Sequence, residues 1–122
     1  MIGSIINLSS LSALRTQPQL LGYSISCAAV EQMTRSLAVA LAPRGIRVNA
    51  IAFASVMSAS LQAALKENPE WRESIEASTP LGRIASADEL AEAAHFLASD
   101  ASGFMTGQVL TLDGGRGLLD VA

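Results

Sequence analysis

Apolar residues gather in three short runs that predict buried strands. The runs cover residues 2–8, 46–52 and 108–112. Short, largely apolar runs of this kind are typical of strands that are covered on both faces, as in a parallel sheet. Ser9 and Ser10 close the first run, and Asp113-Gly114-Gly115 closes the third.

Residues 23–42 carry a helical pattern. Apolar side chains at three- and four-residue spacing form one stripe, which is the face expected to be buried: Val30, Met33, Leu37 and Leu41. On the opposite face, Glu31 and Arg35 are spaced to pair at i,i+4. Pro43 and Gly45 end the pattern, with Gly45 as a left-handed cap.

The rest of the chain predicts three shorter helices. Two cover residues 58–67 and 70–77, and the third runs to about Ser99 from a capping box formed by Ser86 and Glu89. The expected order is β-α-β-α-α-α-β, which indicates parallel strands joined by right-handed crossovers. The sequence therefore predicts an α/β fold in a single domain over residues 1–122.

Composition narrows the function classes. Half of the 122 residues are hydrophobic, 16% are charged and the net charge is −3. A mildly acidic chain without a basic cluster argues against nucleic acid as a partner. No apolar run approaches the roughly 18 residues of a membrane span. One Cys and one His do not supply a usual structural metal site. The single Cys and the absence of a cationic N-terminal region predict a cytoplasmic protein.

Ser10, Tyr23 and Cys27 are the candidate chemical residues. Ser10 ends an apolar strand run, and Tyr23 follows 13 positions later at the start of the long helix. Residues four apart on a helix share a face, so Tyr23 and the side chain at position 27 are expected to look into one site. Ser9 is a rival for Ser10, but the spacing favours Ser10. Cys27 is interpreted as an inert replacement, with a reactive thiol at a helix start as the alternative.

The ordered motifs resemble those of the short-chain dehydrogenase/reductase family. The resemblance implies a partial doubly wound Rossmann-type sheet that consists of the last three strands with their crossover helices. It covers nearly the whole chain, but only the second half of a usual family member, so the N-terminal dinucleotide-binding half is expected to be absent. The matching segments are 5–10, 45–49, 80–83, 94–100 and 106–115, together with Tyr23.

The resemblance implies a role for each candidate residue. Ser10 would bind the substrate oxygen, and Tyr23 would act as general acid in reduction and general base in oxidation. The family has a lysine at the position of Cys27, where its charge lowers the pKa of the tyrosine and its ammonium holds the nicotinamide ribose. Cys27 provides neither the cation nor three strong donors. A free tyrosine has a pKa of about 10, so the chain is expected to be catalytically impaired.

NAD or NADP is the cofactor that the resemblance implies. Four residues would contact it: Phe53, Ala54, Val56 and Ser58. Phe53-Ala54 replaces the usual Pro-Gly pair of the family, and Ser58 replaces a threonine. The Gly-rich turn that cradles the pyrophosphate is absent from the sequence. This chain alone is therefore expected to bind the cofactor weakly or not at all.

Two function classes remain open from the sequence. One is an NAD(P)-dependent oxidoreductase that acts on a small carbonyl compound or alcohol. The alternative is a non-catalytic, degenerate family member or gene remnant that at most associates with an intact relative. The resemblance also implies a homo-oligomer formed through the helix at residues 23–42. The loop at 11–22 and the segment at 55–77 are expected to shape the pocket, and Trp71 and Met57 either form a flap or cover the core.

Overall fold

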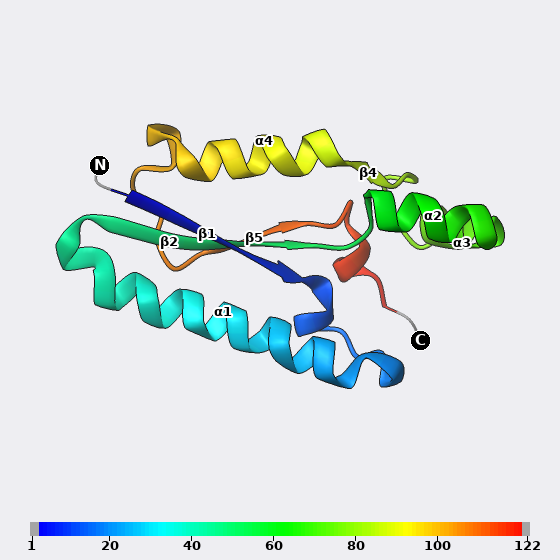
Figure 1. Cartoon of the computed structure of the whole chain (residues 1–122), viewed down its shortest axis with the longest axis horizontal. Coiled ribbons are helices and arrows are strands. Elements are labelled where there is room, and N and C mark those ends of the chain that lie inside the picture. Colours follow the sequence, from blue (N-terminus) through cyan, green and yellow to red (C-terminus); the bar gives the residue numbers. More distant parts are fainter. Residues whose placement is uncertain (1–2, 121–122) are drawn as a thin grey trace.

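A three-stranded parallel sheet organises the computed structural model, which describes residues 3–120. Its strand order is β1 (Gly3–Ser10), β2 (Ile46–Phe53), β5 (Val109–Leu112), so the second strand along the chain lies in the centre. Figure 1 shows α1 (Leu21–Leu41) on one face of the sheet and α4 (Ala87–Ala98) on the other. Because both faces are covered, Val48, Ala50 and Ile51 of β2 are fully buried. The predicted α/β class is confirmed.

The predicted helices and strands are present, with ends that move by one or two residues. The long helix begins at Leu21 and ends at Leu41, where a 3₁₀ turn, η3 (Ala42–Arg44), leads to Gly45 at φ 72°. The other two predicted helices are α2 (Ala59–Glu67) and α3 (Glu70–Ala77), which lie together at one end of the molecule (Figure 1). Ile2, the first residue of the first predicted strand, lies outside the described residues.

Several short elements were not predicted. Two-residue strands β3 (Val56–Met57) and β4 (Ala85–Ser86) pair in parallel and join the start of α2 to the start of α4. Further 3₁₀ turns flank the main elements in residues 3–120, and elements this short leave no periodic signal in a sequence. They are η1 (Leu11–Ala13), η2 (Pro18–Leu20), η4 (Asp100–Ser102) and η5 (Arg116–Leu118).

The buried face of α1 differs from the predicted apolar stripe. Met33 is 44% exposed, and the buried positions are Cys27, Glu31, Thr34 and Ala38. This face is partly polar because β1 supplies matching groups: Asn7 Nδ2 donates to Thr34 Oγ1 at 3.0 Å, and Ser9 Oγ donates to Glu31 Oε2 at 2.6 Å. The predicted pair of Glu31 with Arg35 is wrong, since Arg35 donates to Gln32 instead.

Arg47 fixes the connection between α4 and β5 from inside the sheet. Its side chain is buried, and its Nη atoms donate to the carbonyl oxygens of Leu97, Ser99, Ser102 and Met105 at 2.9–3.2 Å. Burying a charge is costly unless hydrogen bonds replace its water. These bonds do so, and they also satisfy carbonyl oxygens that the end of α4 leaves without helical partners.

Candidate active site

The carboxyl ends of the three strands lie at one edge of the sheet. In the parallel register Ser10 pairs with Phe53, and Phe53 pairs with Leu112. Neighbouring strands are about 4.8 Å apart, so the last residues of β1, β2 and β5 form a short row. The segments that follow these three strands therefore meet around one site.

Ser10 lies at this edge in a fixed conformation. Its Oγ accepts a hydrogen bond from the backbone N–H of Ser12 at 3.2 Å and caps the short helix η1. A hydroxyl that accepts one bond still has its own proton to donate. Ser9, the rival candidate, points inward and donates to Glu31 and to the carbonyl oxygen of Cys27. Ser10 is therefore the serine that lines the cleft at this edge.

Tyr23 and Ser10 both line a cleft of about 740 Å³. The tyrosine lies in the first turn of α1 and is 47% exposed. The loop at 11–22 forms much of the wall, as predicted, whereas the segment at 55–77 contributes only Ser55. The lining residues are Ser10, Leu11, Ser12, Leu14, Arg15, Thr16, Gln17, Tyr23, Ala54, Ser55, Ser78, Arg116 and Leu119.

Cys27 does not share the cleft with Tyr23. It is 6% exposed, lies on the sheet-facing side of α1 and is not among the lining residues. Four residues of an α-helix advance 400°, so position 27 is rotated by about 40° from position 23. A long side chain bridges that offset, but a thiol ends one atom beyond Cβ. The prediction that both side chains look into one site is therefore wrong for this residue.

The predicted cofactor-contacting residues follow β2. Phe53 ends the strand, Ala54 lines the cleft, and Val56 belongs to β3. Ser58 is exposed, and its Oγ accepts the N–H of Leu61 at 3.2 Å as the cap of α2. These positions leave Ala54 open to a bound molecule.

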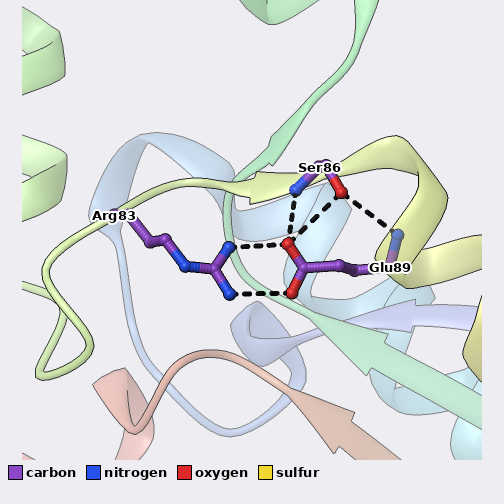
Figure 2. Close-up of polar contacts among 3 residues, drawn as sticks. All are labelled: Arg83, Ser86 and Glu89. Atoms are coloured by element: carbon purple, nitrogen blue, oxygen red, sulfur yellow. Dashed lines mark hydrogen bonds and ion pairs between the residues drawn. The ribbon is translucent and has the colours of Figure 1, made fainter.

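A second cleft, of about 510 Å³, lies beside the first and shares Ala54 and Ser55 with it. Arg83 on its wall forms a two-bond ion pair with Glu89, at 2.6 and 2.9 Å (Figure 2). Glu89 also accepts from the backbone N–H of Ser86, which completes the predicted capping box. The hydrogen bond from Arg83, followed by that from Ser86, lowers the pKa of Glu89 to about 2. The guanidinium of Arg83 therefore binds Glu89 in this structure.

Two absences within the described residues bear on the site. No group of three or more His, Cys, Asp or Glu side chains in residues 3–120 could hold a metal ion. In the same part of the chain, no helix is long and apolar enough to cross a membrane.

Comparison with known proteins decides the family. A family model described as enoyl-(acyl carrier protein) reductase matches residues 1–116. The chain is 38% identical over 116 residues to the short-chain dehydrogenase RED2 of Pyricularia oryzae, with 95% of this chain and 42% of that protein covered. It belongs to the short-chain dehydrogenase/reductase family.

Family relatives differ in their substrates. The chain is 42% identical over 115 residues to a galactitol 2-dehydrogenase (L-tagatose-forming) of Cereibacter sphaeroides, with 93% of this chain and 45% of that protein covered. It is 41% identical over 118 residues to a 3beta-hydroxysteroid dehydrogenase of Eggerthella lenta, with 97% and 45% covered. The chain thus spans about half the length of the curated relatives it matches.

Solved short-chain dehydrogenase structures share the fold. A gluconate 5-dehydrogenase from Burkholderia cenocepacia, in complex with NADP and tartrate, superposes with a TM-score of 0.88 at 33% identity, covering 96% of this chain and 46% of that one. ElxO with NADP bound gives 0.87 at 30% identity, covering 95% and 47%. The parallel sheet and its helices therefore match those of Rossmann-fold family members.

Arg15 and Arg116 were not predicted as site residues of this family member. Arg116 lies four residues after the end of β5, and Arg15 lies five residues after the end of β1. The shared carboxyl edge is the only signal that could have placed both near Ser10, because neither arginine belongs to a motif.

Proposed function

We propose that these residues form the substrate-side half of a nicotinamide-dependent oxidoreductase that interconverts a carbonyl compound and an alcohol. The observation that carries the proposal is the placement of Ser10 and Tyr23 in one cleft at the carboxyl edge of the sheet. The relatives with dehydrogenase names support the reaction class. The structures titled with NADP support a nicotinamide cofactor.

Proton handling is the part of this chemistry that the described residues supply. In reduction, the Ser10 hydroxyl would donate to the carbonyl oxygen, and the Tyr23 hydroxyl would transfer its proton to that oxygen as it becomes an alcohol. The cofactor supplies the hydride in such a reaction. In oxidation, ionised Tyr23 would take the alcohol proton.

Cys27 limits this proposed activity. The buried thiol brings no positive charge towards Tyr23. We therefore propose that the 122 residues alone are inactive and that a complete site built on them would be slow.

The second candidate is a non-catalytic relative that associates with copies of itself or with an intact family member. The outward face of α1 favours this candidate, since Ile25, Met33 and Val39 are exposed there. Homo-oligomerisation through α1 is part of the proposal under either function. Sedimentation at tens of micromolar tests it, and a clean monomer would contradict it. A cytoplasmic location stays a prediction.

A chimera separates the two candidates. The N-terminal half of an active family member, joined in frame before Gly3, would supply the Gly-rich turn. Slow NAD(P)-dependent turnover that Tyr23→Phe abolishes would support the enzyme. The chimera could instead fold and bind the dinucleotide but show the same rate with and without Tyr23→Phe. That result would favour the non-catalytic candidate.

A further inference from the structure

The cleft that holds Ser10 and Tyr23 is positively charged. Arg15 and Arg116 line it, and none of its lining residues is an Asp or Glu. The chain as a whole carries a net charge of −3, so this local excess of positive charge runs against the overall composition. A cleft lined by charges of one sign raises the local concentration of ligands of the opposite sign.

Arg116 is presented by a rigid turn. The two carboxylate oxygens of Asp113 accept the backbone N–H groups of Gly115 at 2.9 Å and Gly117 at 2.8 Å. A Cβ atom at Gly117 would lie 2.9 Å from Leu11 Cδ1, so the turn packs tightly against the segment after Ser10. The side chain of Arg116 reaches Ser55 Oγ at 3.5 Å, which is a weak contact.

Arg15 lines the cleft from the loop that follows β1. Its backbone N–H donates to the carbonyl oxygen of Leu11 at 3.0 Å, so its position follows from the turn that Ser10 caps. Within residues 3–120, the ion pairs involve Arg72 and Arg83, and neither cleft arginine has a carboxylate partner. Both guanidinium groups can therefore receive an anion.

We propose that the cleft selects substrates that carry a carboxylate, which Arg116 binds with help from Arg15 while the carbonyl or hydroxyl group lies at Ser10 and Tyr23. A guanidinium matches the planar carboxylate through two parallel hydrogen bonds. The substrate class is then a small oxo acid or the corresponding hydroxy acid. The position of the reacting carbonyl or hydroxyl group rests on the proposed function. The binding of the carboxylate by the arginines does not.

Binding to the 122-residue chain tests the anion site directly. Pyruvate would be titrated at low salt and followed by backbone amide NMR shifts, with methyl pyruvate as the uncharged analogue. We expect shifts around Ser55 and Gly117 with pyruvate only. Arg116→Gln should weaken binding about tenfold or more, as expected for loss of a hydrogen bond to a charged group. Arg15→Gln should weaken it less, and Arg44→Gln, at an exposed site outside the cleft, should leave it unchanged.

Three outcomes would overturn the proposal: no saturable binding of pyruvate, equal binding of methyl pyruvate, or equal losses in Arg116→Gln and Arg44→Gln. Equal binding of inorganic phosphate would also overturn it, because the site would then be a general anion site. The proposed function can fail while the anion site stands. In that case the chimera would show no turnover that depends on Tyr23, but pyruvate would still shift the NMR signals.

Discussion

Ser9 Oγ donates a 2.6 Å hydrogen bond to Glu31 Oε2, and both residues are buried between β1 and α1. Ser9 precedes Ser10, which lines the cleft, and Glu31 lies one helical turn after Cys27. The same hydroxyl is 3.3 Å from the carbonyl oxygen of Cys27. The pair therefore joins the strand that ends in Ser10 to the helix that carries Tyr23.

Removal of the Ser9 hydroxyl should destabilise the fold. Ser9→Ala leaves the buried Glu31 carboxylate without its side-chain donor, which should cost about 1–3 kcal/mol in the free energy of unfolding. Urea denaturation measures this loss, and Ser36→Ala, at an exposed hydroxyl on the same helix, should change stability by no more than about 0.5 kcal/mol. Strictly additive effects of Ser9→Ala and Glu31→Gln in a double-mutant cycle would contradict the coupling.

Substitution of Cys27 should change the rate of the chimera. Cys27→Lys would extend an ammonium from the buried face of α1 towards Tyr23 and lower the pKa of the tyrosine. Turnover at neutral pH should rise by about 10²-fold, the scale of general acid–base catalysis, and the pH–rate profile should shift to lower pH. Cys27→Met fills the same space without a charge and should give no gain. Equal rates for the lysine and methionine variants would show that the missing cation does not limit the site.

Loss of Arg47 should be among the most destabilising single changes. Arg47→Met removes charge-assisted hydrogen bonds to four carbonyl oxygens, although each keeps a second donor, such as Ser4 Oγ on Leu97. The loss should cost about 1.5–3 kcal/mol in the free energy of unfolding, the scale of a hydrogen bond to a charged group. Arg47→Lys should recover only part of this, because one ammonium cannot match the fork of a guanidinium. The midpoint of chemical unfolding measures both, with the exposed Arg44→Met as control. Surface substitutions usually change stability by no more than about 0.5 kcal/mol. If Arg47→Met unfolds within that range of the control, Arg47 does not stabilise the fold as proposed.

The ion pair between Arg83 and Glu89 should make the stability of the fold depend on pH in the acid range. The folded pKa of Glu89 is about 2, below its ordinary value of 4.5, so its stabilising effect is present above pH 4.5 and is lost as pH falls towards 2. The difference in thermal midpoint between the wild type and Glu89→Gln should therefore shrink over that window. Glu92→Gln removes the same charge from an exposed position on the same helix and should show no such change. A constant wild-type-to-Glu89→Gln difference from pH 7 to pH 2 would refute the prediction.

The order of elements could be predicted from the sequence because each main strand and helix carries its own periodic pattern. The capping box at Ser86 and the cap at Gly45 are likewise local signals, and both were predicted. The buried face of α1 was not, because Glu31 and Thr34 are buried by hydrogen bonds to side chains of β1 more than 20 residues away. A pattern of hydrophobic and polar residues does not show which distant side chains will form hydrogen bonds.

The site was predicted in part for the same reason. Ser10 and Tyr23 follow from a strand end and a helix start, which are local features. The separation of Cys27 from the cleft depends on the rotation of α1 against the sheet. The two arginines depend on how the turns after β1 and β5 meet at the carboxyl edge. Neither of these relationships can be read from a linear pattern.

Arg47 has a consequence for the order in which the chain folds. Its hydrogen bonds join residues 50 to 58 positions apart. Closing a loop of that length loses chain entropy before any contact forms, and such non-local pairings are typical of slow folding. We therefore expect the Arg47 contacts to form after the folding transition state, so that their loss accelerates unfolding more than it slows folding. The buried guanidinium would then act mainly on the lifetime of the folded chain.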